Sequence, residues 1–184
     1  MANGLMLNQD SILIRAGIES DAAALAAFAA RTFEETFGAD NRPDDLRAHL
    51  SNAFGIRQQT QELLNPNMVT LLAHQRDVLV AFAQVQRKDP PPCVTAVRPI
   101  ELHRFYVDRP AHGKGIAHHL MRAVHDVARS FAGTHLWLGV WERNPRAIAF
   151  YKKAGFADCG STVYHVGSDP QIDRVMIAPV LPES

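Results

Sequence analysis

Apolar residues recur along the chain with two periods, one typical of helices and one typical of strands. After residue 115, the residues Ile116, Leu120, Val124 and Phe131 fall on one face of a helix. Asn144 followed directly by proline predicts another helix start, because this pair suits the cap and the first helical position. Helices are predicted over 22–36, from 41 onward, over 56–64, 116–131 and 144–154, and strands over 12–15, 68–74, 78–86, 100–107, 136–140, 162–166 and 173–177.

The order of these elements predicts the fold class. Helices interspersed among strands that mostly follow one another favour an α/β (α+β) fold, with a mixed, mostly antiparallel sheet of about seven strands flanked by helices. The three predicted strands between residues 68 and 107 should form a meander. With 184 residues, of which 47% are hydrophobic, the chain should form a single domain over residues 1–184 with a sizeable core.

The charge and the cysteine content indicate which binding partners and which cellular compartment to expect. Lys and Arg number 19, as do Asp and Glu, and this zero net charge argues against nucleic acid as a partner. Cys93 and Cys159 are far apart in the sequence and have no metal-ligand spacing, which favours a reduced, cytoplasmic protein without a metal site. No apolar run approaches the ~20 residues of a membrane span, and no signal peptide is evident, so no membrane partner is expected.

The segment from His112 to Ala117 reads His-Gly-Lys-Gly-Ile-Ala and lies between a predicted strand and a predicted helix. Such a turn can point several backbone N–H groups at one spot, where the positive end of the helix dipole favours a phosphate or pyrophosphate. Glycines also occur there simply to ease a tight turn, so the pattern alone leaves both readings open. A dinucleotide-binding fingerprint would need a third glycine, and a P-loop would need Ser or Thr after Lys114.

A second segment places an amide, a small apolar patch and a phenol on one helix face. Asn144, Ala147, Ile148 and Tyr151 stand at positions i, i+3, i+4 and i+7. Each has an ordinary structural reason, as a cap, as core residues, or as a phenol with its ring inside and its hydroxyl at the edge. Those reasons do not explain why this face follows the glycine-rich turn by one helix and one strand.

Together the two segments resemble the GNAT superfamily of acyl-CoA N-acyltransferases. The family's turn reads Gln/Arg-x-x-Gly-x-Gly/Ala, and the sequence matches it with Gly115 and Ala117 in the fixed places. Residues 144–156 are like the family's later motif throughout, and residues 32–37 and 167–176 resemble bacterial members. The N-terminal pattern resembles bacterial polyamine-type acetyltransferases. The resemblance covers nearly the whole chain. His112 departs from the pattern, since the family usually has Gln or Arg there, and this leaves one side-chain contact open.

The resemblance implies transfer of an acetyl group from acetyl-CoA to a primary amine. An alkyl amine has a pKa near ~10.4 and is protonated at neutral pH, so a base is needed. By resemblance, Tyr151 is the general acid for the CoA sulfur and Glu101 is the base, with His103 or water alone as alternatives. Residues 101, 103 and 105 should share one strand face. The implied cofactor-binding residues are Phe105, Val107, His112, Gly113, Lys114, Gly115, Ile116, Ala117 and Asn144.

The acceptor should bind between the N-terminal helices and the strand ends, and its identity stays open. A polyamine-like small molecule, a peptide N-terminus, an amino acid and an aminoglycoside-like drug all fit. A non-catalytic acyl-CoA-binding sensor or partner module is the alternative to an enzyme, and a homodimer is compatible with the family. The histidines at 118, 119 and 125 are expected to be solvated. Five acids could attract a polycation or merely cap and solvate helices: Glu34, Glu35, Asp40, Asp44 and Asp45.

Overall fold

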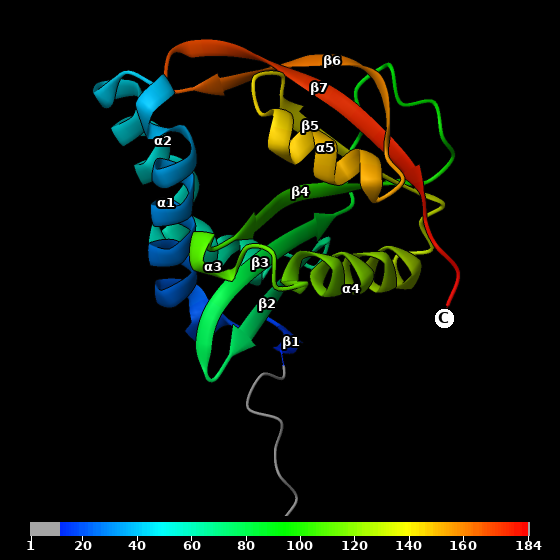
Figure 1. Ribbon diagram of the computed structural model, residues 1–184, viewed down its shortest axis with the longest axis horizontal. Helices are drawn as coiled ribbons and strands as arrows, with labels where there is room; N and C mark the ends of the chain where they lie inside the picture. The colour runs from blue at the N-terminus through cyan, green and yellow to red at the C-terminus, as the bar shows by residue number, and fades with distance from the viewer. Residues whose placement is uncertain (1–11, 184) are drawn as a thin grey trace, which may run out of the picture.

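The computed structural model describes residues 12–183, and its strands form one seven-stranded sheet in the order β1-β2-β3-β4-β5-β7-β6 (Figure 1). All neighbouring strands run antiparallel except β4 and β5, which confirms the predicted mixed, mostly antiparallel sheet. The strands are β1 (Ile12–Ala16), β2 (Met68–Gln75), β3 (Val78–Gln86), β4 (Pro99–Val107), β5 (His135–Trp141), β6 (Ala157–Val166) and β7 (Asp169–Pro179). The α-helices are α1 (Ala22–Phe37), α2 (Pro43–Phe54), α3 (Ile56–Leu63), α4 (Ile116–Ser130) and α5 (Pro145–Lys153), and short 3₁₀ turns cover Glu19–Asp21, Gly38–Asp40 and Arg109–Ala111.

The predicted meander of β2, β3 and β4 is confirmed. Arg76 and Asp77 join β2 to β3, and both have positive φ angles, of 50° and 64°. Two such residues form a type I′ turn, whose twist matches that of antiparallel strands. The turn therefore sets the pairing of Gln75 with Val78, and a bulge at Val80 shifts the register of the pairs beyond it.

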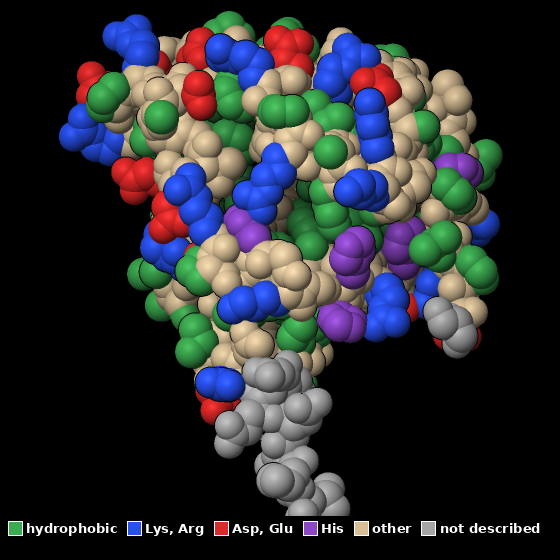
Figure 2. Space-filling view, in the orientation of Figure 1, with side chains coloured by type: hydrophobic (Ala, Val, Ile, Leu, Met, Phe, Trp, Pro, Cys, Tyr) green, Lys and Arg blue, Asp and Glu red, His purple; other side chains and the backbone are tan. Residues whose placement is uncertain are grey.

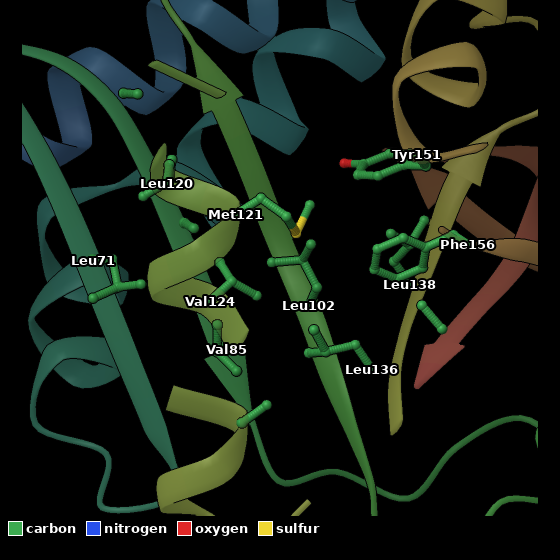
Figure 3. Close-up of a cluster of buried hydrophobic side chains, with 14 of the residues drawn as sticks. Leu71, Val85, Leu102, Leu120, Met121, Val124, Leu136, Leu138, Tyr151 and Phe156 are labelled. Atoms are coloured by element: carbon green, nitrogen blue, oxygen red, sulfur yellow. The ribbon is translucent and has the colours of Figure 1, made fainter. Parts of the chain in front are cut away.

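Helices cover both faces of the sheet. In β2, Leu71 packs in the cluster that includes the buried side of α4, whereas Leu72 packs in the cluster that includes α1. Strands buried on both faces read as continuous apolar runs, as β2 and β3 do. Figure 3 shows Leu120, Met121 and Val124 of α4 beside the strands of the first cluster. In Figure 1, α4 and α5 lie in front of the sheet.

The parallel pairing of β4 with β5 is short. Only Pro99, Ile100 and Glu101 of β4 pair with β5, the last of them opposite Trp137. Beyond this point the two strands separate, whereas β4 continues to pair with β3 as far as Val107. The separation leaves a gap in the middle of the sheet.

A β-bulge lies in β4 at the mouth of this gap. Gln84 of β3 pairs with Arg104, but its successor pairs with Leu102, so His103 is the extra residue. A bulge reverses the alternation of side chains between the faces of a strand. Phe105 therefore packs on the α5 side of the sheet, against Phe150 and in the same cluster as Leu102. The prediction that Phe105 shares a strand face with Glu101 is wrong.

The two C-terminal strands are longer than predicted. β6 begins at residue 157 rather than 162, and β7 extends from Asp169 to Pro179 rather than from 173 to 177. Most positions of β6 are exposed or half-buried and many are polar, so β6 has no apolar run that would reveal its full extent. Hydrogen bonding along β7 defines it instead.

Among the histidines of α4, His118 and His119 are exposed as expected, but the prediction of a solvated His125 is wrong. The C-terminal segment packs over α4, and Nδ1 of His125 accepts a hydrogen bond of 3.2 Å from the backbone N–H of Leu181. Burial lowers the pKa of His125, with a smaller contribution from Arg129.

Two further observations concern the cysteines and the membrane. Cys93 and Cys159 are both free thiols, and the fold brings them to the same small cluster around Trp137 and Val175.

No helix within residues 12–183 has the length and apolar character needed to cross a bilayer.

A buried ion pair connects α3 to the meander. Nη1 of Arg104 lies 2.5 Å from a carboxylate oxygen of Glu62 and 2.6 Å from Oε1 of Gln84. Burial disfavours the charge on Glu62, but Arg104 and the hydrogen bonds from Gln58 and Gln84 outweigh burial and lower its pKa. The cluster fixes Arg104 in β4, directly after the bulge.

Glu62→Ala should therefore destabilise the fold by about 3 kcal/mol or more, because it leaves the Arg104 charge buried without a counter-charge. Urea unfolding at pH 7 measures the loss. Since the folded pKa of Glu62 is lowered, its stabilisation is present above the ordinary carboxyl pKa and is lost as the pH falls through the folded value. Glu34→Gln, an exposed change on α1, is the control, and equal stability of the two variants would contradict this account.

Candidate active site

A cavity of about 920 Å³ follows the gap between β4 and β5. It is lined from α1, from the loop after β3, and from β4, α5, β6 and β7, so it passes through the sheet from one face to the other. Figure 2 shows its mouth between α4 and α5 as a hollow with hydrophobic side chains in its depth and basic and histidine side chains around it. The basic and histidine side chains lining this half are Arg109, Arg146, His112 and His118.

The edge of β4 that faces the gap is free for pairing. Asp108 donates its backbone N–H to the carbonyl of Val80 at 2.9 Å, so this residue faces β3. Because backbone groups alternate in direction along a strand, those of Phe105 and Val107 face the gap. Nε2 of His112 lies 2.8 Å from the carbonyl oxygen of Val107, so the His112 side chain folds back onto this edge.

The glycine-rich turn has the geometry of an anion site. Gly113 and Gly115 have φ angles of 77° and 78°, which glycine adopts without the cost that other residues incur. In the part of the chain that the structure describes, the N–H groups of Gly113, Lys114 and Gly115 have no hydrogen-bond partner. The first N–H groups of α4, from Ile116 and Ala117, are also free of intrahelical bonds. All of these except Lys114 line the cavity.

Helix α5 positions Tyr151 at the gap. Oδ1 of Asn144 accepts a hydrogen bond of 3.1 Å from the N–H of Ala147, which confirms the predicted N-cap, and Asn144 also lines the cavity. The Tyr151 ring lies among the rings of Phe105, Phe150 and Phe156, with centroids 6.4, 5.4 and 5.7 Å away. Figure 3 shows the phenol extending from the α5 side across the gap toward β4.

Burial raises the pKa of Tyr151 far above its usual value. The phenol is therefore protonated at neutral pH. Its hydroxyl has no hydrogen-bond partner among residues 12–183, so it is free to donate to a group bound in the gap.

Glu101 lies on the other side of the gap, opposite Trp137 of β5. Its carboxylate contacts Nε2 of Gln86 at 2.5 Å, Nζ of Lys88 at 3.5 Å and Nδ1 of His103 at 3.7 Å. Burial alone would raise the pKa of Glu101, but contacts with His103, Gln86 and Lys88 outweigh it and lower the pKa. The predicted proximity of Glu101 to His103 is confirmed, and the carboxylate is ionised at neutral pH.

The acid-rich N-terminal region contributes little to the cavity. Of the five predicted acids, only Glu35 is among the described lining residues, and it pairs with Arg31 at 3.0 Å. Asp44 pairs with Arg47, and Asp45 accepts hydrogen bonds from Ser168. Four of the five acids therefore lie outside the described lining of the cavity, which favours the second alternative, that they cap and solvate helices.

Sequence reasoning missed several cavity residues on this acceptor side. Tyr106, Trp141, Tyr164 and Asp173 all line the cavity, although they belong to four separate strands. Asp173 was predicted only as the start of a closing strand. The signal available was the Trp-x-Gly-x-Trp pattern of β5, which places a glycine between two tryptophans on one strand face.

The profile of the acetyltransferase (GNAT) family matches residues 26–156, and the chain belongs to this family. An uncharacterized N-acetyltransferase of Mycobacterium bovis is 30% identical to it over 158 residues, which cover 86% of this chain and 97% of that protein. A streptothricin acetyltransferase of Streptomyces lavendulae is 50% identical over 52 residues, 28% of each chain. The solved structure of the PaiA N-acetyltransferase of Thermoplasma acidophilum in complex with coenzyme A has a TM-score of 0.76 at 19% identity, covering 92% of this chain and 99% of that one.

The protein is therefore an acetyl-CoA-dependent N-acetyltransferase, and acetyl-CoA is its cosubstrate. The free N–H groups of the turn, the free edge of β4 and the size of the cavity all fit such a molecule. Within residues 12–183, no group of three or more His, Cys, Asp or Glu side chains is placed to hold a metal ion.

The environment of the tyrosines makes a spectroscopic prediction. Burial raises the pKa of Tyr106 and Tyr151 far above the ordinary value of 10.0, and that of Tyr164, which is 38% exposed, in the same direction. The tyrosinate absorbance of Tyr106 and Tyr151 at 295 nm should therefore appear only when the protein unfolds. Because the folded pKa values are raised, folding stability should fall as the pH rises above 10. Titration of more than one tyrosine near pH 10 with circular dichroism unchanged would contradict the burial.

Proposed function

We propose that this enzyme transfers the acetyl group of acetyl-CoA to a primary amine of a small, polyamine-like molecule or of a peptide. The observation that carries the proposal is the gap between β4 and β5, which joins two different chemical environments. On one face lie the glycine-rich turn and Tyr151, and on the other lies the ionised carboxylate of Glu101. A thioester held in the gap would face a proton donor on one side and an incoming amine on the other.

The cofactor half is proposed to be held mainly by backbone groups. The N–H groups of residues 113–117 and the N-terminus of α4 would bind the pyrophosphate, as helix N-termini bind anions. The backbone of Phe105 and Val107 would pair with the pantetheine arm as a neighbouring strand does. A carbonyl oxygen accepts two hydrogen bonds, so His112 and pantetheine can share the Val107 carbonyl. The Nδ2 group of Asn144 would donate to the same arm.

The proposed chemistry assigns one proton transfer to each face. The protonated acceptor amine loses its first proton to bulk solvent through a water held by Glu101 and His103, because a carboxylate of lowered pKa is better suited to orienting that water than to keeping the proton. The free amine nitrogen then forms a bond to the thioester carbonyl carbon, and the carbon–sulfur bond breaks. Tyr151 donates its phenolic proton to the departing sulfur. By itself this transfer is uphill, because burial raises the pKa of the Tyr151 phenol whereas a thiol has a pKa of about 8.5. The attacking nitrogen releases its second proton as the amide forms, and the return of this proton to the phenolate completes the balance.

Release of free thiol from acetyl-CoA tests the proposal. The acceptor panel contains diamines, amino acids, short peptides with a free N-terminus, and streptothricin, which is included because of the partial match to a streptothricin acetyltransferase. Turnover with a diamine or a peptide is the expected result. Acetyl-CoA binding without turnover on any amine would contradict the proposed acceptors, and absence of acetyl-CoA binding would contradict the reading of the turn.

Tyr151→Phe should lower kcat by about 10²-fold or more, because it removes the proton donor for the sulfur and little else. The dissociation constant of acetyl-CoA, measured by calorimetry, should change little, since the ring that packs against Phe150 is retained. A variant with undiminished kcat would show that the sulfur leaves without help from this phenol.

Gly115→Ala should weaken acetyl-CoA binding about tenfold, because a side chain at positive φ strains the turn and disturbs its N–H groups. Gly155→Ala is a matched control. Both glycines have positive φ and open space where a Cβ would lie, but Gly155 follows α5 outside the cavity. Both variants should lose about 1 kcal/mol of stability. Equal acetyl-CoA affinity of the two would mean that the turn does not bind the cofactor.

A further inference from the structure

Asp173 of β7 lines the cavity on its acceptor side. It pairs with Trp141 of β5 and with Thr162 of β6. A Cβ atom at Gly139 would lie only 3.0 Å from Oδ2 of Asp173, so the carboxylate leans over this glycine. Trp137, Gly139 and Trp141 alternate on one strand face. The glycine therefore leaves a space between two indole rings, and the carboxylate of Asp173 reaches into that space.

The half-buried carboxylate of Asp173 makes no hydrogen bond and no ion pair among residues 12–183. Burial alone raises the pKa of Asp173 to about 6, and no neighbouring cation offsets that shift. The cations that line this side are engaged elsewhere, Arg104 with Glu62 and Lys88 with Glu101. A buried, unpaired carboxylate is costly, and a ligand cation would relieve that cost.

Aromatic rings surround the same space. The rings of Trp141 and Phe37 pack edge to face with centroids 5.8 Å apart, Arg143 covers one face of Trp141, and Tyr106 and Tyr164 also line this part of the cavity. The faces of such rings attract cations, most strongly where water is excluded. An unpaired carboxylate within an aromatic enclosure is suited to an alkylammonium group.

An ammonium group bound beside Asp173 would lie apart from the amine that reacts beside Glu101. Glu101 pairs across β4 and β5 with Trp137, whereas the Asp173 carboxylate lies at Gly139, two residues further along β5 and on the next strand. Two residues correspond to ~7 Å along a strand. One amine can therefore lie beside Glu101 while a second cationic group lies beside Asp173, joined by a short methylene chain.

We propose that Asp173 binds a second ammonium group of the acceptor, so that the enzyme selects diamines and polyamines over monoamines. The inference rests on the proposed function, because the reacting amine is taken to be the one beside Glu101. Asp173 is a specificity-determining residue in this scheme and takes no part in the proton transfers.

The test compares 1,4-diaminobutane with 4-aminobutan-1-ol, which has the same chain with a hydroxyl in place of one amine. The native enzyme should show a kcat/KM at least about tenfold higher for the diamine, because only the diamine can pair with a buried carboxylate. Asp173→Asn should abolish this preference by raising KM for the diamine, with kcat and the kinetics of the amino alcohol little changed. Glu34→Gln, which removes a remote exposed carboxylate of α1, should keep the preference.

Calorimetric binding of 1,4-diaminobutane in the presence of coenzyme A gives a readout that does not need turnover. It should weaken about tenfold in Asp173→Asn. The variant should also melt at or above the native temperature at pH 8, because it replaces an unpaired buried carboxylate with a neutral amide, so weaker binding cannot be ascribed to misfolding.

Three results would overturn the inference: a native enzyme that does not distinguish the two amines, a variant that loses kcat equally on both, or diamine binding that is equal in the native enzyme and the variant. If the native enzyme acetylates both amines equally, the inference fails but the proposed function stands. If neither amine is acetylated while diamine binding still depends on Asp173, the proposed acceptor chemistry fails and the binding site stands.

Discussion

Parallel pairing between β4 and β5 stops at Glu101 and Trp137, and the active site depends on that early stop. Unpaired backbone beyond this point gives β4 an edge that another extended chain can pair with. The same separation opens the sheet, so that side chains from its two faces meet across one cavity. A fully paired sheet would hold Tyr151 and Glu101 on opposite sides of a continuous wall.

Several features keep the two strands apart. The bulge at His103 turns Phe105 toward the rings of Phe150 and Tyr151, and these rings fill the space beside β5 on the α5 side. On the other face, Arg104 is tied to Glu62 of α3. These contacts fix the side chains of β4 on both faces of the sheet, so the gap is part of the fold itself.

Local features of the fold and site were predictable from the sequence, and long-range ones were not. The cap at Asn144, the turn at Gly113 to Gly115 and the meander each depend on residues close together in the sequence. The bulge at His103 results from the pairing of β4 with β3, which no local pattern reveals. The role of Asp173 as a cavity residue depends on the neighbouring β5, and the burial of His125 depends on a segment 56 residues away.

The central claim is that the free edge of β4 receives the cofactor, and hydrogen exchange of two backbone amides tests it most directly. In the unliganded protein, the N–H groups of Phe105 and Val107 should exchange rapidly in NMR experiments, whereas that of Tyr106, which faces β3, should be protected. Addition of acetyl-CoA should slow the exchange of Phe105 and Val107 and leave Tyr106 unchanged. Exchange at Phe105 and Val107 that saturating acetyl-CoA does not alter would contradict the account.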